Sequence, residues 1–442
     1  MTEKDNTTQN GRRTRLDPER HLWAWVPSLC FTKALSHVII IAIALVFYKQ
    51  MGLSNAEITF YISWLYLPWI LKPYWSPFLQ LHNKRQWILT MQLLIGAALA
   101  GVAFTIPADF WLQSTLCLFF LIAFSSAAHD VTADTFCIKA IDKADHPIFM
   151  GLRSASYCLA TIFGQGILIM TAGNLQIIFR NSIQYSWSLT FYGVTGLFIG
   201  LWLYHNYILP KTTEDFPQQD YKPHAIVSEI RNVQLSFFNK PQAWTGLCFM
   251  LFFCMPKGLL SQVSALFLID AAHNGGLGLS PQEYGLAQGT VGGIGLTLGG
   301  ILGSIVISEN GLKKWLWPMA CAITLPDIVY VYLSYSLTDS LSIINICVFL
   351  EQLGYGFGLT ACMRYLSYYS QGREATRHYT MCKALMIISF MLPCIISGTL
   401  QEMMGYRTFF IMVMFFCAIT FIVSAFLKIT PTFGQKNTKE KE

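Results

Sequence analysis

The chain has 442 residues, of which 54% are hydrophobic and 12% are charged, and its mean hydropathy is +0.45. This composition excludes a soluble protein of this size, and it indicates a protein that crosses a membrane several times. The net charge of +6 is explained by basic residues held on the cytoplasmic side of a membrane, so no nucleic-acid partner is expected.

Apolar runs long enough to cross a bilayer, about 20 residues each, recur along the chain and leave short loops between them. We predict an all-α integral membrane protein with about twelve transmembrane helices. The predicted spans are 22–47, 57–79, 87–106, 112–139, 149–172, 187–209, 242–269, 284–308, 315–333, 341–369, 379–401 and 408–429.

The longest polar connection, residues 210–241, separates an N-terminal bundle from a C-terminal bundle, each with about six spans. Most Lys and Arg residues fall on the side of this connection, which predicts that it and both termini are cytoplasmic. The expected domains are a tail (1–21), the first bundle (22–209), the linker (210–241), the second bundle (242–429) and a second tail (430–442).

The two predicted bundles share short sequence elements at matching positions. Gly52-Leu53-Ser54 after the first span corresponds to Gly278-Leu279-Ser280 after the seventh, and the basic loops at 84–87 and 313–315 also correspond. On this register Lys33 lies opposite Lys257. Two similar six-helix halves are typical of the major facilitator fold, which places its binding site between the halves near the membrane midplane.

The fourth predicted span contains two aspartates at membrane depth, where ionisable residues usually mark a substrate or proton path. Asp130 and Asp134 are four residues apart, so they lie on one helix face with Cβ atoms about 6 Å apart. Repulsion between them would let one hold a proton near neutral pH, which makes them candidates for proton coupling. The alternative is a permanent brace, in which each aspartate pairs with Arg153, Arg364 or Lys72.

Three further ionisable residues lie within predicted spans, and two of them have two interpretations each. His129 is a candidate proton relay, although a hydrogen-bonded packing role is commoner. Glu351, in the tenth span, is either a second proton site or a partner for Lys257. Asp327 follows Pro326 in the ninth span and is expected to face outward with a structural role at a kink.

Lys33 and Lys257 lie deep in the first span of their halves, where an unpaired lysine would attract an anionic substrate. Pro27 and Pro256 are expected to unwind these helices locally. Each lysine could instead neutralise an acid such as Glu351. We favour anion binding because the basic residues within the spans outnumber the acidic ones.

Aromatic residues are dense in the second span, and their rings can stack on sugars. Tyr66, with Tyr355 in the tenth span, is therefore a candidate substrate contact. Aromatic side chains are also abundant at membrane interfaces, and we give that explanation more weight for the second span as a whole.

Basic residues near the inner ends of several spans are candidates for a gate or for ion pairs with the aspartates: Arg153, Arg364, Lys383 and Lys72. Such side chains can also extend to lipid headgroups, which is commoner near helix ends. The gate is the better interpretation for Arg153 and Arg364, which lie deeper.

No cofactor is expected. The 12 cysteines lie within predicted spans and form no cluster with metal-ligand spacing, so we predict neither a metal site nor disulfides. The chain has no Gly-Lys-Ser/Thr nucleotide-binding loop. It also shows no combination of nucleophile, base and oxyanion donors, so an enzyme is not expected.

The fourth span carries the most specific resemblance. Ala127-Ala128-His129-Asp130-Val131-Thr132-Ala133-Asp134 resembles the Ser-Gln-Asp-Ile-x-x-Asp-Ala signature of the AmpG-type muropeptide permeases, which are related to acetyl-CoA transporters within the major facilitator superfamily. Weaker matches occur at 72–77, 151–153, 374–385 and 405–410, so the similarity covers nearly the whole chain. Only the two-aspartate element is distinctive.

The resemblance implies a proton-driven importer of peptidoglycan turnover products, GlcNAc-anhydro-MurNAc and its peptides, in a bacterial inner membrane. The implied partners are an anionic glycan or glycopeptide, protons and membrane lipids, and a monomer is expected. Alternative cargoes are another organic anion, a glycan fragment or a drug. An alternative of a different class is a membrane receptor or scaffold that binds cell-wall fragments without transporting them.

Overall fold

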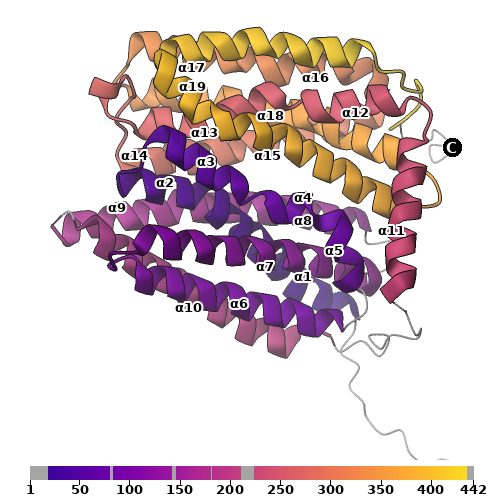
Figure 1. Ribbon diagram of the computed structural model, residues 1–442, viewed down its shortest axis with the longest axis horizontal. Coiled ribbons are helices and arrows are strands. Elements are labelled where there is room, and N and C mark those ends of the chain that lie inside the picture. The colour runs from indigo at the N-terminus through magenta and orange to yellow at the C-terminus, as the bar shows by residue number, and fades with distance from the viewer. Residues whose placement is uncertain (1–17, 80–82, 142–145, 181, 211–222, 436–442) are drawn as a thin grey trace, which may run out of the picture.

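A computed structural model describes residues 18–79, 83–141, 146–180, 182–210 and 223–435. Within these ranges the chain is helical and contains no strand. The helices form two bundles that lie one on the other, with α1 to α10 below and α12 to α19 above in Figure 1. The prediction of an all-α protein built from two helical halves is confirmed.

The segments of the N-terminal half follow one another from α1 to α10. They are α1 (Pro18–Val38), η1 (Ile39–Ile43), α2 (Ala44–Gln50), α3 (Asn55–Trp64), α4 (Leu67–Ile70), α5 (Lys72–Leu79), α6 (Lys84–Thr105), α7 (Trp111–Ala140), α8 (His146–Thr161), η3 (Ile162–Leu168), α9 (Ile169–Ile178) and α10 (Ile183–Ile208). Of these, η1 and η3 are π-helical turns within longer helices.

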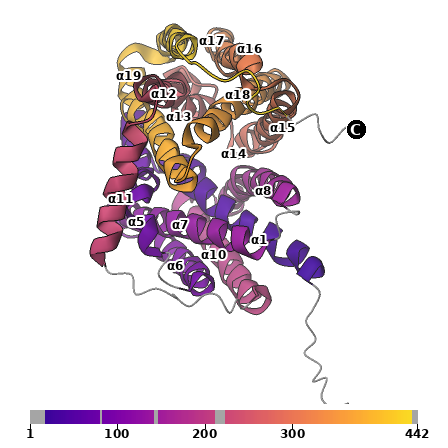
Figure 2. The same ribbon diagram turned by 90° about the vertical axis from the view of Figure 1, so that its right-hand side faces the viewer.

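The remaining segments belong to the linker and the C-terminal half. They are α11 (Pro223–Phe238), α12 (Ala243–Phe252), α13 (Met255–Ile269), η5 (Ala272–Asn274), α14 (Pro281–Tyr284), η6 (Gly285–Gly292), α15 (Gly293–Asn310), α16 (Leu312–Thr324), η7 (Leu325–Asp327), α17 (Ile328–Ser336), α18 (Leu341–Ser370) and α19 (Ala375–Ala425). The helix α11 runs along one end of the molecule from one half to the other, as Figure 2 shows. We call this end the linker end and the opposite one the far end.

Ten helices in the described ranges are long and apolar enough to cross a membrane. The predicted second span is absent from this set because it is broken into α3, α4 and α5, where Pro68 and Pro73 interrupt the helical hydrogen bonds. The predicted eleventh and twelfth spans both lie in α19, and the chain changes direction between them, as predicted, at Gly405. This residue has φ 74° and ψ 164°, a conformation that glycine adopts without strain.

The two prolines near the central lysines behave differently. Pro256 is the second residue of α13, which follows a break at Cys254, as expected. Pro27 lies inside α1 without interrupting it, so the prediction of local unwinding there is wrong. Pro27 lacks the N–H that would donate to the carbonyl four residues earlier, but the helix continues through it. Ser156 Oγ of α8 donates to the Pro27 carbonyl itself at 3.2 Å and so ties α8 to α1 at this point.

The halves are in close contact at the far end. A Cβ atom added to Gly289 of η6 would lie 2.2 Å from the backbone nitrogen of Gly166 in η3, and one added to Gly398 of α19 would lie 2.3 Å from the carbonyl oxygen of Asn55 in α3. Glycine at these positions lets helices of opposite halves approach backbone to backbone. The far end is therefore closed in this structure.

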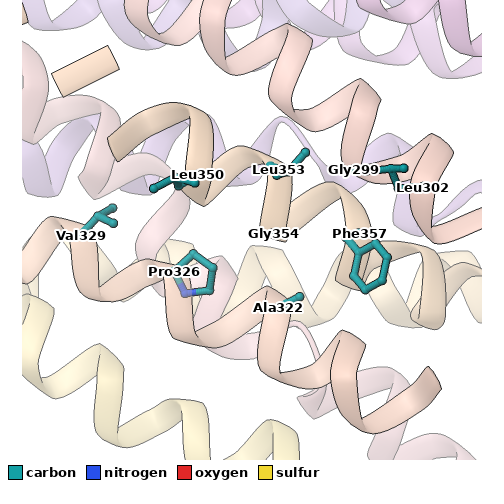
Figure 3. Close-up of a pocket in the computed structure, with 9 residues that line it drawn as sticks. All are labelled: Gly299, Leu302, Ala322, Pro326, Val329, Leu350, Leu353, Gly354 and Phe357. Atoms are coloured by element: carbon teal, nitrogen blue, oxygen red, sulfur yellow. The ribbon is translucent and has the colours of Figure 1, made fainter. Parts of the chain in front are cut away.

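A groove of about 420 Å³ lies between α15, α18 and the α16–α17 segment (Figure 3). Its lining is Gly299, Leu302, Ala322, Pro326, Val329, Leu350, Leu353, Gly354 and Phe357. Leu302 and Leu350 are about half exposed, which places the groove on the outer surface of the C-terminal half. An apolar lining offers no hydrogen bonds to a sugar or a carboxylate, so the functional site lies elsewhere.

Candidate functional site: two clusters of charge

The first cluster lies in the N-terminal half, between α1, α5, α7 and α8. Lys33 Nζ lies 2.5 Å from Asp134 Oδ1 and also pairs with Asp130. Lys72 Nζ lies 2.5 Å from Asp130 Oδ2, and Arg153 Nη2 lies 3.6 Å from Asp134 Oδ2. We call these five residues the N-terminal cluster. Their side chains are 13% to 34% exposed, so solvent reaches them.

The unbroken helix α7 explains why both aspartates reach one lysine. Their four-residue spacing places them one turn apart on the face that meets Lys33 of α1. The ammonium between the two carboxylates offsets their mutual repulsion. The ion pairs of the aspartates with Lys72 and Arg153 correspond to the permanent brace, the second of the two interpretations given above. Lys33, which we had expected to bind the substrate, takes part in these ion pairs as well.

The second cluster lies in the C-terminal half and is more deeply buried. Lys257 Nζ of α13 donates to Asp327 Oδ1 of η7 at 2.8 Å and also to Glu351 Oε1 of α18. Lys257, Asp327 and Glu351 are 5%, 3% and 2% exposed. We call these three residues the C-terminal cluster.

Two sequence-based expectations about the C-terminal cluster are wrong. Lys257 is not an unpaired cation, because its ammonium forms ion pairs with two carboxylates. The alternative from the sequence, that Lys257 pairs with Glu351, agrees with the structure. Asp327 does not face outward. Asp327 points into the bundle because it continues the buried face of this span, on which Ala320, Ile323 and Tyr330 lie at helical spacing from it.

The remaining predicted cations differ in their surroundings. Lys383 of α19 is half-buried, lies over the Tyr379 ring at 5.1 Å and is close to Asp130 and Asp134, yet it forms no ion pair with any described residue. Arg364 of α18 is exposed and likewise pairs with no described acid. The expected gate contact of Arg364 with Asp134 is not formed in this state.

The two candidate tyrosines lie where the halves face one another. Tyr66 precedes α4, at the break in the second span, and Tyr355 is on α18 with its ring 5.0 Å from Lys257 Nζ. Both are half-buried, and Tyr355 is close to Tyr66 and to Tyr157 of α8. Tyr355 thus separates the C-terminal cluster from the space between the halves.

His129 faces the interior of the N-terminal half. Its Nε2 lies 3.0 Å from Gln92 Nε2, Gln92 Oε1 lies 3.1 Å from His205 Nδ1, and His205 Nε2 lies 2.9 Å from Ser28 Oγ. This chain of contacts joins four helices, which agrees with the packing interpretation of His129. Gln92, His205 and Ser28 were not among the candidate residues from the sequence. They could have been found as polar residues that lie within apolar spans.

The closed far end is held by a polar network that sequence analysis also missed. Asn55 Nδ2 donates to Asp270 Oδ2 at 3.1 Å and to Gln401 Oε1 at 2.7 Å, and Tyr406 donates to Asp270 Oδ2 at 2.9 Å. Lys49 Nζ lies 3.2 Å from the same carboxylate oxygen. We call these five residues the far-end network.

Asp270 is the charged centre of the far-end network and lies just beyond the end of α13. Partial burial alone would raise the pKa of Asp270. The Lys49 ammonium, with hydrogen bonds from Asn274, Tyr406 and Asn55, outweighs that effect and holds the pKa below its ordinary value. The carboxylate is therefore ionised, and the network carries a charge-assisted contact between the halves.

Comparison with known proteins agrees with this geometry. A model of the Major Facilitator Superfamily matches residues 28–344. The chain is 23% identical over 386 residues to "Putative transporter AmpG 4" of Rickettsia conorii, covering 85% of this chain and 88% of that protein. It is 21% identical over 350 residues to "Anhydromuropeptide permease" of Escherichia coli (strain K12), covering 78% and 67%.

Solved structures show the same fold at low identity. The nucleoside transporter NupG superposes with a TM-score of 0.66 at 14% identity, covering 92% of this chain and all of the other. A D-xylose-proton symporter superposes with a TM-score of 0.70 at 10% identity, covering 95% and 99%. These likenesses establish the arrangement of the helices.

Proposed function

Because this chain belongs to the major facilitator superfamily, we propose that it is a proton-coupled importer of peptidoglycan turnover products, GlcNAc-anhydro-MurNAc and its peptides. The names of its relatives, a putative AmpG transporter and an anhydromuropeptide permease, support this cargo class. The mechanism proposed is alternating access, in which the two halves expose one central site to each side of the membrane in turn.

The observation that carries the proposal is the charge balance at the centre of the molecule. In the N-terminal cluster the bases Lys33, Lys72 and Arg153 face two carboxylates, and Lys383 approaches from the other half without a described ion-pair partner of its own. An excess of positive charge beside accessible solvent favours an anionic ligand. Muropeptides carry carboxylates, and Tyr66 and Tyr355 offer rings for their sugars.

The same ion pairs supply a route for coupling. While Asp130 and Asp134 are ionised, both pair with Lys33. Protonation of one would leave Lys33 with a single carboxylate and increase the positive charge that the cluster offers to the substrate carboxylate. Return of the proton to water would restore the ion pairs and displace the anion. One proton moving down a potential of 100 mV supplies about 2.3 kcal/mol.

The orientation follows from the distribution of basic residues. Under the positive-inside rule the linker end is cytoplasmic and the far end faces the periplasm of a bacterial inner membrane. The far-end network then closes the periplasmic side of the carrier in this structure. The expected functional unit is a single copy of the chain.

Uptake into proteoliposomes tests the proposal. Purified protein should accumulate labelled GlcNAc-anhydro-MurNAc when the outside is acidic, and a protonophore should abolish the accumulation. Asp130→Asn should lose accumulation, whereas Asp339→Asn, at an exposed position, should retain it. Wild-type accumulation by Asp130→Asn without a proton gradient would refute the coupling role.

The same assay separates the alternatives. A carrier of another anion or drug would show no uptake of the labelled glycan, and unlabelled muropeptides would not compete with its own cargo. A receptor or scaffold would bind the glycan saturably without accumulating it inside the vesicles.

A further inference from the structure

The C-terminal cluster holds an unbalanced charge in a closed environment. One ammonium, on Lys257, faces two carboxylates, on Asp327 and Glu351, and none of the three is more than 5% exposed. With all three groups ionised the cluster would carry a buried net negative charge. Because an uncompensated buried charge is strongly unfavourable, the arrangement favours binding of one proton.

The hydrogen bonds distinguish the two carboxyl groups. Glu351 Oε1 accepts from Lys257, and Glu351 Oε2 accepts from Gln352 Nε2 at 2.9 Å and from the Tyr330 hydroxyl at 3.4 Å. An ionised Glu351 is thus fully satisfied. Asp327 Oδ1 accepts from Lys257, but Asp327 Oδ2 is buried without a hydrogen-bond partner among the described residues. The unpartnered oxygen of Asp327 is the place for the proton.

No other charged group compensates the cluster in the part of the chain that the structure describes. The titratable groups packed around it are Tyr330 of α17, Tyr355 of α18, Tyr284 of α14 and Cys417 of α19. Tyrosine and cysteine are ordinarily neutral at pH 7, so none of them supplies a positive charge.

Access of water and protons to the C-terminal cluster depends on the position of one half relative to the other. The Tyr355 ring covers Lys257 on the side of the central space and lies near Tyr66 and Tyr157 of the N-terminal half. Movement of one half relative to the other would change how far the Tyr355 ring shields Lys257 from the central space. Protonation of the cluster is thereby tied to the conformational state.

The two clusters therefore have opposite charge balance. The N-terminal cluster has more bases than acids and is open to solvent, whereas the C-terminal cluster has more acids than bases and is closed. We propose that Asp327 and Glu351, with Lys257 as their counter-charge, form a second proton-binding site, separate from the carboxylates of the N-terminal cluster, with the proton residing on Asp327 in the state described here. A role of this site in coupling rests on the proposed transport function, but proton binding itself does not.

Infrared difference spectroscopy of the purified protein tests proton binding directly. Wild-type protein should show the carbonyl stretch of a protonated carboxyl at neutral pH, and it should disappear in both Asp327→Asn and Glu351→Gln. In either variant one carboxylate remains for Lys257, so the cluster is neutral without a proton and the fold should be retained. Asp339→Asn serves as the matched control and should keep the band.

The location of the band decides the proposal. A band that persists in both Asp327→Asn and Glu351→Gln would overturn it, as would a band that disappears in Asp130→Asn but not in Asp327→Asn. Absence of any such band in the wild type at neutral pH would also overturn it. These readouts need no substrate, so they remain informative if the cargo proposal fails.

Transport then tests the role of the bound proton. Asp327→Asn should lose accumulation driven by a proton gradient and retain exchange of labelled for unlabelled muropeptide, which requires no net proton movement. Gradient-driven accumulation at the wild-type level would overturn a coupling role for the site.

Discussion

The Asn55 amide of the N-terminal half donates a hydrogen bond of 3.1 Å to the Asp270 carboxylate of the C-terminal half, and both side chains are buried. The two residues are 215 positions apart in the chain. Their contact joins the ends of two helices whose separation would open the far end. The far-end network therefore bears directly on which side of the membrane the carrier faces.

Breaking this network should favour the far-end-open state. Asn55→Leu removes the donor to Asp270 and Gln401, and Gly398→Leu places a side chain where a Cβ atom alone would lie 2.3 Å from the Asn55 carbonyl oxygen. Both variants should exchange amide hydrogens faster at residues 55–60 and 396–402. Gly196→Ala, where an added Cβ has no neighbour within 4 Å, should not change exchange there. Unchanged exchange in both test variants would show that the network does not hold this end closed.

The far-end network should be insensitive to pH in the range where transport operates. The pKa of Asp270 is lowered in the folded state, so its contribution to stability is fully present above the unfolded value of about 3.9 and is lost only as the pH falls through the lower folded value. Hydrogen exchange at residues 270–274, corrected for the intrinsic pH dependence, should be equally protected at pH 5 and pH 7.5. Loss of protection at pH 5 would contradict this sign.

Lys383 should contribute to substrate affinity rather than to the fold. Its ammonium forms no ion pair with a described residue, so Lys383→Gln leaves no described acid unpaired and removes attraction for the ligand carboxylate. We expect KM to rise about tenfold, equivalent to about 1.4 kcal/mol, with Tm unchanged. Lys383→Arg should retain most of the affinity. Arg364→Gln, at the exposed cation, is the control and should leave KM near the wild-type value.

Lys33 should stabilise the N-terminal cluster by separating its two aspartates. Lys33→Ala leaves Asp130 with Lys72 but removes the closest partner of Asp134. We expect a loss of about 1 to 3 kcal/mol, below the roughly 3 to 5 kcal/mol typical of fully buried pairs because solvent reaches this cluster. Thermal unfolding of the wild type and of Lys33→Ala in detergent measures this loss of stability.

A second substitution shows whether the loss comes from charge. Asp134→Asn added to Lys33→Ala should restore part of the lost stability, because it removes the unpaired carboxylate. Strictly additive losses in the double variant would mean that Lys33 acts through packing alone.

The sequence by itself determined the helical class, the order of the apolar segments, the two halves and the helix face that carries Asp130 and Asp134. These features follow from local physics, since each helix in a bilayer satisfies its own backbone and must be apolar along its length. The boundary predicted between the spans 379–401 and 408–429 contains the turn at Gly405. The break of the second span at its prolines was not predicted.

The tertiary structure alone decided which charges pair. Lys33 meets Asp134 across 101 residues, and Lys257 meets Asp327 across 70, because those pairs depend on how each helix is rotated about its own axis when it packs. Asp327 shares its helix face with the buried Ala320, Ile323 and Tyr330, and the packing of that face within the bundle brings it to Lys257. Spacing along the chain sets the face that a residue occupies on its helix, but only packing against the neighbouring helices sets what that face meets.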